Sequence, residues 1–420
     1  MSSETPASVE TAASAESPET KASRASRKDD HVRLASAQQT EGPRRTDFDD
    51  LEFVHHALSG TSPERVDLSV ELGEWTWPTP FYVNGMTGGT ETTAKINRDL
   101  AIAAAETGLP MACGSMSVAL DDAEAAKGFT VIREENPDGF VMGNLGAGRS
   151  ADDARRAVEL LRADALQLHI NPVQETAMPE GTRDFSTWLS GLEDIVAACP
   201  VPVVVKEVGF GLSRRTLTLL AEIVAACPVP VIVKEVGFGL SRRTLTLLAD
   251  IGVQYADVSG AGGTDFLRIE NDRSPADDFS MLTGFGQSAL ACLLDAPSEW
   301  TTETTMDDGV SNRVLLASGG VRNPYDVVKA LACGARAVGV AGTFLQTVLD
   351  HGPDGLVDLV RTWQTQTSAL FALLGAQRST DLTATDLLTR GRLGEFARLR
   401  GIDVTALSHR SDVLSRRNQL

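Results

Sequence analysis

Two consecutive copies of one 28-residue segment, residues 195–222 and 223–250, constrain the fold more than any other feature of the chain. Each copy contains a short valine-rich run, then a glycine-rich stretch, then a serine and a leucine-rich amphipathic stretch. The valine-rich run indicates a parallel strand buried on both faces, and the serine indicates the N-cap of a helix. The repeated unit is therefore predicted to be a strand, a loop and a helix. The copies are identical at 26 positions and differ only at Val204/Ile232 and Glu222/Asp250.

A single strand-loop-helix unit cannot bury itself, because its strand needs parallel neighbours and its helix needs a sheet to cover. The rest of the chain supplies further strands, most of them followed by glycine and an amphipathic stretch, and the two copies bring the expected number to nine. We predict a (β/α)₈ TIM barrel with one tandemly duplicated βα unit. The surplus copy is expected to lie outside the closed barrel and to expose its valine strand. The other candidate strands end near Asn84, Cys113, Asn144, His169, Ser259, Ser318 and Val340.

Composition sets the domain organisation and limits the partners. Residues 1–26 contain almost no large apolar side chain, which predicts a disordered leader, and residues 27–420 are expected to form one barrel domain. The net charge of −19 and the lack of a basic stripe argue against nucleic acid or an anionic membrane as a partner. No signal-peptide core or membrane-length apolar run is present, so we expect a cytoplasmic protein whose five cysteines are buried thiols.

Loops that follow the strands build the active site of a TIM barrel, and here nearly all of them consist of small, hydrogen-bonding residues. Glycines in these loops allow backbone N–H groups to approach a phosphate, although they also serve as turn formers. Flavin mononucleotide (FMN), with a planar polar ring and a phosphate tail, suits such a lining. Lys206 or Lys234 ends the repeated strand, so one ammonium is expected to meet the pyrimidine edge of the flavin. The alternative for this lysine is an ion pair with a neighbouring carboxylate.

A charged segment, Arg27-Lys28-Asp29-Asp30-His31, follows the predicted leader. In isolation such a segment is a solvated tail. Beside a barrel mouth with few other cations, it can instead act as a mobile clamp over an anionic substrate. The sequence leaves both interpretations open.

Five segments in this order resemble the type 2 isopentenyl diphosphate isomerase family, the flavin-dependent form of that enzyme, and the match runs from about Arg27 to Ala376. One of them, His169-Ile170-Asn171-Pro172-Val173-Gln174-Glu175, is expected to lie in a strand-end loop. The other four are Arg27-Lys28-Asp29-Asp30-His31, Met86-Thr87-Gly88-Gly89, Val205-Lys206-Glu207-Val208-Gly209-Phe210-Gly211 and Val258-Ser259-Gly260-Ala261-Gly262-Gly263-Thr264.

The resemblance implies a TIM barrel that interconverts isopentenyl diphosphate and dimethylallyl diphosphate with reduced FMN, Mg²⁺ and NADPH as reductant, in a homo-oligomer. It assigns catalysis to Gln174 and Glu175, and Mg²⁺ to Glu175, which could otherwise be a helix N-cap or a surface carboxylate. His169 would bind diphosphate or simply pack in the mouth. The substrate would contact Arg27, Lys28, Ser115, Met116, Ser117 and Gln174. FMN would contact Gly85, Met86, Thr87, Ser115, Asn144, Lys206 or Lys234, Thr264, Gly320, Val321, Arg322, Ala341 and Gly342.

Two other functions remain compatible with this sequence. An FMN-dependent 2-hydroxy-acid oxidoreductase has similar glycine loops, but it needs a base histidine with an arginine partner for the substrate carboxylate. A flavin-binding protein that the duplication has inactivated is the second. The duplication is not a feature of the resembled family, and either lysine copy is expected to be able to occupy the flavin site.

Overall fold

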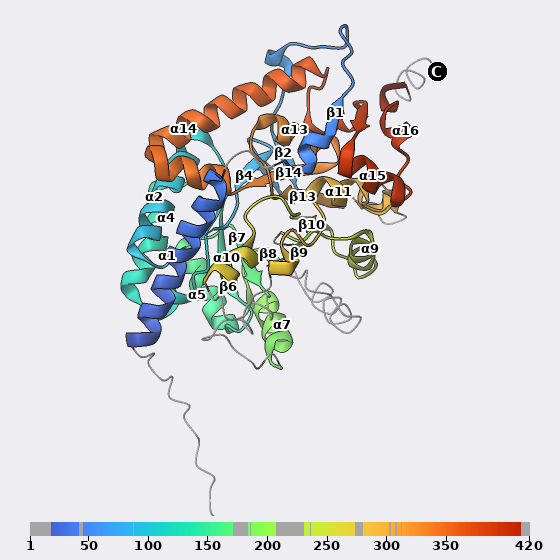
Figure 1. Cartoon of the computed structure of the whole chain (residues 1–420). Helices are drawn as coiled ribbons and strands as arrows, with labels where there is room; N and C mark the ends of the chain where they lie inside the picture. Colours follow the sequence, from blue (N-terminus) through green and yellow to red (C-terminus); the bar gives the residue numbers. More distant parts are fainter. Residues whose placement is uncertain are drawn as a thin grey trace, which may run out of the picture.

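Nine parallel strands form a closed barrel surrounded by helices (Figure 1). The structure, a computed structural model, describes residues 18–41, 45–86, 88–170, 184, 186–206, 231–235, 237–273, 280–301, 304–306, 309–311 and 313–412. Every strand predicted from the sequence is present. Around the barrel the strands are β4 (Phe81–Val83), β5 (Met111–Ala112), β6 (Val141–Gly146), β7 (Ala165–His169), β8 (Val203–Lys206), β9 (Val231–Lys234), β10 (Tyr255–Asp257), β13 (Val314–Ser318) and β14 (Ala335–Val340).

Both copies of the repeat contribute a strand to the barrel, so the expectation that one copy is displaced is wrong. β8 pairs in parallel with β7 on one side and with β9 on the other, and β9 then pairs with β10. The valines of β8 are buried, and so are those described in β9. The two units have the same local preferences, and a parallel strand left outside the barrel would lack hydrogen-bond partners and expose its valines. With nine strands in the barrel, the strands of both copies are paired and buried.

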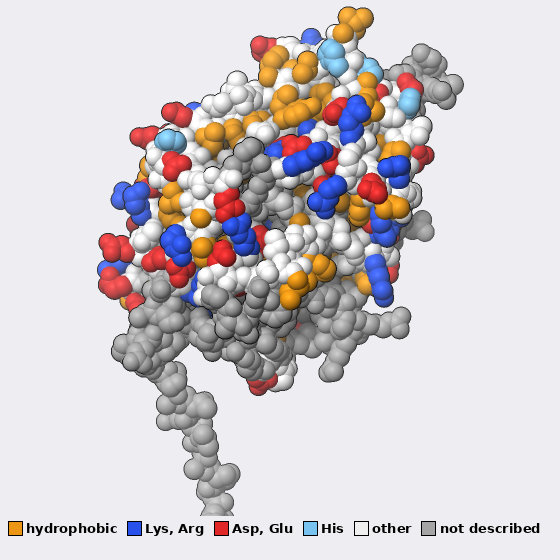
Figure 2. All heavy atoms as spheres, in the orientation of Figure 1, with side chains coloured by type: hydrophobic (Ala, Val, Ile, Leu, Met, Phe, Trp, Pro, Cys, Tyr) orange, Lys and Arg blue, Asp and Glu red, His pale blue; other side chains and the backbone are white. Residues whose placement is uncertain are grey.

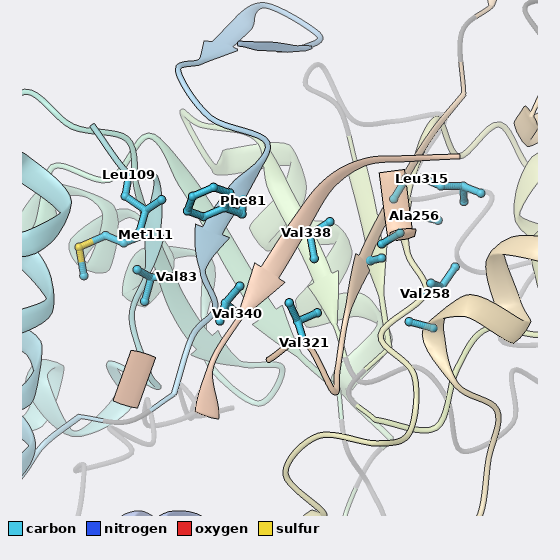
Figure 3. Close-up of a cluster of buried hydrophobic side chains, with 14 of the residues drawn as sticks. Phe81, Val83, Leu109, Met111, Ala256, Val258, Leu315, Val321, Val338 and Val340 are labelled. Carbon is cyan, nitrogen blue, oxygen red and sulfur yellow. The ribbon is translucent and has the colours of Figure 1, made fainter. Parts of the chain in front are cut away.

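Alternating side chains on the barrel strands divide the core into two layers. Outward-facing residues such as Phe81, Met111 and Val338 pack beneath the helices in one large cluster (Figure 3). Inward-facing residues such as Met142 and Ile232 form a second, smaller cluster inside the barrel. This two-sided burial is typical of a parallel sheet. It leaves only the last inward residue of each strand available to a ligand at the open end.

Helices cover the outside of the barrel, and several begin at the cap residues that their sequences favour. Ser241 accepts a hydrogen bond from the Thr244 amide and starts the helix of the second copy, as predicted. The corresponding residues of the first copy lie outside the described part of the chain. The surrounding helices are α2 (Glu91–Thr107), α3 (Ser117–Asp121), α4 (Ala123–Glu135), α5 (Ala151–Leu161), α7 (Trp188–Ala198), α9 (Arg242–Asp250), α10 (Phe266–Arg273), α11 (Ala289–Leu294), α12 (Ser298–Thr301), α13 (Pro324–Ala332), α14 (Gly342–Leu373), α15 (Gly391–Leu399) and α16 (Val404–Leu407).

A two-stranded hairpin, β2 (Val70–Leu72) with β3 (Trp75–Trp77), closes the N-terminal end of the barrel. Its side chains join the inner cluster and leave a cavity of about 20 Å³, which has room for roughly one water molecule. Two further pairs lie outside the barrel. β1 (Leu51–Phe53) joins β15 (Leu387–Thr389), and β11 (Thr304–Met306) joins β12 (Gly309–Ser311). The open, C-terminal end of the barrel is therefore the end that can admit a ligand.

The N-terminal helix α1 (Pro18–Thr40) begins inside the segment predicted to be a disordered leader, because residues 18–26 of that segment are helical. Residues 1–17 lie outside the described chain. From Arg27 onward, α1 packs against α2, α10 and α14 (Figure 1). These contacts anchor the helix beside the open end of the barrel.

Charged side chains of both signs share the surface of the molecule. On the face that Figure 2 shows, Lys and Arg side chains lie among Asp and Glu side chains and are not gathered into a stripe. Over the whole chain, acidic residues outnumber basic ones, 57 against 38. A surface of this kind offers no extended cationic track for a polyanion.

Candidate active site

The C-terminal ends of the nine strands form one mouth, and the inward side chain at each end is set by strand register. Lys206 pairs in register with His169 on one side and with Lys234 on the other, and Lys234 pairs with Asp257. In a parallel sheet, residues in register point to the same face. The mouth therefore carries a contiguous row of one histidine, two lysines and one aspartate.

Lys234 is held inside the barrel by an ion pair with Asp257, and it also donates to Ser318 Oγ at 2.9 Å. Asp257 is fully buried, and it accepts from Tyr82 Oη at 2.9 Å and from the Ser259 amide at 3.0 Å. Burial lowers the pKa of the Lys234 ammonium, although Asp257 favours its charged form. The ion-pair alternative considered for the repeat lysine therefore applies to Lys234.

A chain of hydrogen bonds joins three neighbouring strand ends on the opposite side of the mouth. The His169 ring donates through Nδ1 to Asn144 Oδ1 at 3.1 Å, and Asn144 Nδ2 donates to the Cys113 carbonyl at 3.4 Å. The Met116 amide donates to the Asn144 carbonyl at 2.7 Å, and the Met116 side chain is fully buried in the core. Met116, predicted to contact the substrate, is thus enclosed in this structure, whereas the His169 imidazole is only partly buried.

A buried amide group lies beneath the ends of β4 and β5. Gln167 is 2% exposed, and its Oε1 has no hydrogen-bond partner within the described chain. A Cβ atom on Gly85 would lie 2.7 Å from the Cys113 carbonyl oxygen and 3.4 Å from Gln167 Oε1. Only glycine therefore fits at this point. A buried, unpartnered amide oxygen is costly, which favours a ligand or a water molecule bound here.

The glycine loops after β10 and β13 pack backbone against backbone. A Cβ atom on Gly319 would lie 2.1 Å from the Gly260 carbonyl oxygen, and one on Gly263 would lie 2.9 Å from the Gly320 amide nitrogen. Gly319 and Gly320 also have positive φ, of 97° and 75°. Close packing is thus one reason for these glycines, as the turn-former alternative predicts. The same packing brings backbone groups of both loops to one side of the mouth, next to Val321 and Thr264.

Helix α1 lies along the mouth and contacts several of its loops. Lys28 donates to the Gly88 carbonyl and, at 3.4 Å, to the Ser115 carbonyl. Ser36 donates to Gln346 on α14 at 2.7 Å. Gln39 lies so close to Gly342 that a Cβ atom on Gly342 would clash with the side-chain amide of Gln39. The predicted clamp interpretation agrees with this placement of Lys28.

A second contact of α1 is electrostatic. His31 lies 2.9 Å from Glu270 of α10, and Arg273 lies 2.6 Å from the other oxygen of the same carboxylate. Burial alone would raise the pKa of Glu270, but the hydrogen bond and charge of His31, together with Arg273, hold the pKa below its ordinary value. The carboxylate therefore stays ionised and ties α1 to α10.

Arg322 is predicted to contact FMN, but in this structure carboxylates bind its guanidinium. It is 2.8 Å from Asp326 through Nε and 2.7 Å from Asp49 through one terminal nitrogen. These hydrogen bonds raise the pKa of Arg322 and lower that of Asp49. The side chain thus joins α13 to the 3₁₀ turn Asp47–Asp50, and its assignment to FMN stays a prediction.

The remaining predicted residues fall into two groups. Gly85, Met86, Ser115, Ser117, Asn144, Thr264, Gly320, Val321, Ala341 and Gly342 follow or end barrel strands at the mouth, and Arg27 precedes Lys28 on α1. Thr87, Gln174 and Glu175 lie outside the described residues. Sequence reasoning missed Asp257 and Gln167, although each is a polar residue within a buried strand, and that pattern is a usable signal.

Two results limit the chemistry of the described part of the chain. Its residues contain no cluster of three or more metal-binding side chains. The predicted Mg²⁺ ligand Glu175 lies outside the described residues and stays a prediction. The described cysteines Cys113, Cys199, Cys292 and Cys333 are all buried, as predicted. Burial raises the pKa of Cys113 to about 12, so this thiol is not a nucleophile at neutral pH. None of the described helices combines the length and apolarity that crossing a membrane requires.

Comparison with solved structures supports the fold. The chain matches a mandelate oxidase variant with a TM-score of 0.55 at 17% identity, covering 89% of this chain and 97% of that one. It matches a flavocytochrome b2 variant with a TM-score of 0.53 at 18% identity, covering 84% of this chain and 78% of that one. At this identity the likeness extends to the fold alone.

Sequence comparison is more specific. The profile of FMN-dependent dehydrogenases matches residues 162–389. The chain is 48% identical over 387 residues to an isopentenyl-diphosphate delta-isomerase of Streptomyces sp. (strain CL190), covering 92% of this chain and 96% of that protein. It is 49% identical over 398 residues to one from Kitasatospora griseola, with 95% and 98% covered. The chain therefore belongs to the isopentenyl-diphosphate delta-isomerase family, on the FMN-dependent dehydrogenase fold.

Proposed function

We propose that this protein interconverts isopentenyl diphosphate and dimethylallyl diphosphate with the help of FMN. The observation that carries the proposal is the 48% identity to the Streptomyces isomerase, which extends over 92% of this chain. A likeness of that extent takes in the barrel and its mouth. The oxidases share only the fold with this chain, at 17% and 18% identity, so the 2-hydroxy-acid oxidoreductase alternative has no comparable support.

The mouth fits FMN in two respects. At its base, the unpartnered Oε1 of Gln167 lies beside Gly85, which has no side chain to cover it, and the polar edge of a flavin ring suits such a place. At its other side, the glycine loops after β10, β13 and β14 offer backbone N–H groups for a phosphate. When bound, reduced FMN would supply the group that gives and takes the proton. The residues that would hold it are Gly85, Met86, Ser115, Asn144, Lys206, Thr264, Gly320, Val321, Ala341 and Gly342.

The diphosphate of the substrate would lie above the flavin site, under α1. Lys28 is fixed there by the Gly88 and Ser115 carbonyls, which point its ammonium at the mouth. Cation and hydroxyl groups are suited to diphosphate oxygens. Glu175 would hold Mg²⁺ with the substrate phosphates completing the shell, and Gln174 would orient the alkene. The apolar interior below would exclude water from this site. An acid needs such a dry site in order to protonate a weakly basic alkene.

An anaerobic assay with isopentenyl diphosphate, FMN, NADPH and Mg²⁺ tests the proposal. We expect dimethylallyl diphosphate to form, and its formation to stop when FMN is left out. Protein that binds FMN but forms no product would support the inactivated flavoprotein instead. Oxidation of lactate or glycolate by the same preparation would support the oxidoreductase. Replacing NADPH with dithionite separates the need for a reduced flavin from the choice of reductant. The homo-oligomeric state and the cytoplasmic location are further predictions, for sedimentation and cell fractionation.

A further inference from the structure

The duplication places two lysines of identical local sequence side by side in the mouth. Lys206 and Lys234 occupy equivalent positions at the ends of β8 and β9 and are partners in register. Neighbouring strands are about 4.8 Å apart, so two like charges begin close together. Two ammonium groups in this position repel each other, so each needs a compensating group of its own.

Their surroundings do differ, and the reason is strand order. β9 is next to β10, so Lys234 meets Asp257, and its exposure falls to 4%. β8 is next to β7, so Lys206 has His169 as its partner in register instead. In a barrel with one copy, a single strand would lie between β7 and β10, and its single lysine would have both neighbours. The ninth strand separates these neighbours.

Lys206 lies between His169 of β7 and Lys234 of β9, and His169 is hydrogen-bonded to Asn144, one of the predicted flavin residues. Burial raises the pKa of Cys113 at the end of β5, and the charges of Lys206 and of Lys28 both act to lower it. Lys234 is instead drawn to Ser318 and Asp257 on the opposite side.

We propose that the duplication has divided two roles between the lysines: Lys234 is the internal counter-ion of Asp257, and Lys206 is the lysine that contacts the flavin. The flavin half of this inference rests on the proposed function. Lys234 is then a positioning residue, which stabilises the barrel without touching the cofactor. The barrel diameter also increases by about an eighth with the ninth strand, which makes simultaneous contact of one lysine with both sides harder.

The test compares FMN affinity and stability of matched variants. FMN binding is measured by quenching of flavin fluorescence, the reduction potential of the bound flavin by anaerobic titration, and stability by urea unfolding. Lys206→Met is expected to weaken FMN binding roughly tenfold or more and to make the flavin harder to reduce, because a cation beside the ring favours the reduced anion. Its unfolding midpoint should stay near that of the wild type.

The matched control is the same substitution one strand away. Lys234→Met should lower the unfolding midpoint, and the double variant Lys234→Met/Asp257→Asn, which removes both buried charges, supplies a folded protein if the single variant is too unstable. We expect this double variant to bind FMN as the wild type does. The inference would be overturned if the double variant lost FMN affinity and shifted the reduction potential of the flavin, while Lys206→Met changed neither the affinity nor the potential.

A single-copy variant made by deleting residues 207–234, which joins Lys206 to Glu235, gives an independent test. In that variant, substitution of the one remaining lysine should reduce FMN affinity and stability together. Separate effects there would contradict the division. Wild-type protein that does not bind FMN would overturn the proposed function and the flavin half of the inference, whereas equal FMN affinity in Lys206→Met and wild type would overturn the inference alone.

Discussion

The ion pair inside the barrel makes a sharp prediction about stability. Asp257 is fully buried, and Lys234 is 4% exposed. Replacing Lys234 with methionine keeps most of the length of the unbranched side chain but leaves the carboxylate without its cation. Removing one partner of a buried pair typically costs about 3–5 kcal/mol, because an uncompensated charge stays in the interior.

Other contacts to Asp257 place the expected cost toward the lower end of that range. The Tyr82 hydroxyl donates to the carboxylate at 2.9 Å, the Ser259 amide at 3.0 Å and the Ser318 hydroxyl at 3.2 Å. These donors remain in the variant, so the carboxylate keeps part of its solvation. We expect Lys234→Met to reduce the free energy of unfolding by about 3 kcal/mol, a large share of the roughly 5–15 kcal/mol typical of a domain.

Urea unfolding at neutral pH, followed by tryptophan fluorescence, measures this cost. Trp75 and Trp77 lie in the hairpin that closes the barrel and report on its integrity. The cycle needs Lys234→Met, Asp257→Asn and the double variant. Because the two residues are in contact, the double variant should lose at least about 1 kcal/mol less than the sum of the two single variants.

Additive losses would refute the reasoning, since they would mean that the two charges do not stabilise each other. Lys206→Met is the matched control for a buried lysine at the same depth. A loss in that variant as large as in Lys234→Met would show that any lysine in the row supports the fold, and that the pair with Asp257 is not special.

Three further predictions concern other residues. The pKa of Glu270 lies below its ordinary value of 4.5, because the contacts with His31 and Arg273 outweigh burial. The stabilising effect of this carboxylate is therefore complete above pH 4.5 and is lost as the pH falls through the lowered pKa. The difference in unfolding free energy between wild type and Glu270→Gln should shrink on acidification. Burial raises the pKa of Cys113 to about 12, so folded Cys227→Ser protein, which lacks the thiol outside the described residues, should resist alkylation at mildly alkaline pH, and rapid labelling would contradict this. Glu175→Gln should retain FMN but lose Mg²⁺-dependent turnover, and full activity would remove Glu175 from the proposed metal site.

Strand positions and the location of the mouth could be predicted from the sequence because both follow from short-range patterns. The apolar runs before Asn84, Asn144 and Ser318 are barrel strands, and small residues follow them at the open end. The N-cap at Ser241 also follows from local sequence. Such features depend on neighbours a few residues away, which the linear chain displays directly.

Contacts between distant segments could not be predicted in the same way. Arg322 suits a phosphate in isolation, yet Asp49, from a 3₁₀ turn far away in the sequence, binds its guanidinium beside the nearby Asp326. The sequence of Lys28 and its neighbours is equally compatible with a solvated tail, and only the packing of α1 brings this lysine to the carbonyls of Gly88 and Ser115. In each case the partner is chosen by packing between elements far apart in the sequence, and local pattern carries no information about that choice.

The repeat shows most clearly which features follow from local sequence and which depend on tertiary contacts. By itself, the amino-acid sequence determined that two nearly identical strand-loop-helix units exist and that each ends its strand in an inward lysine. Only the tertiary structure decided that both strands join the barrel, and that Lys234 rather than Lys206 pairs with Asp257. Segments of the same sequence have the same local preferences, so the neighbouring strands, β7 on one side and β10 on the other, are what makes the two lysines different.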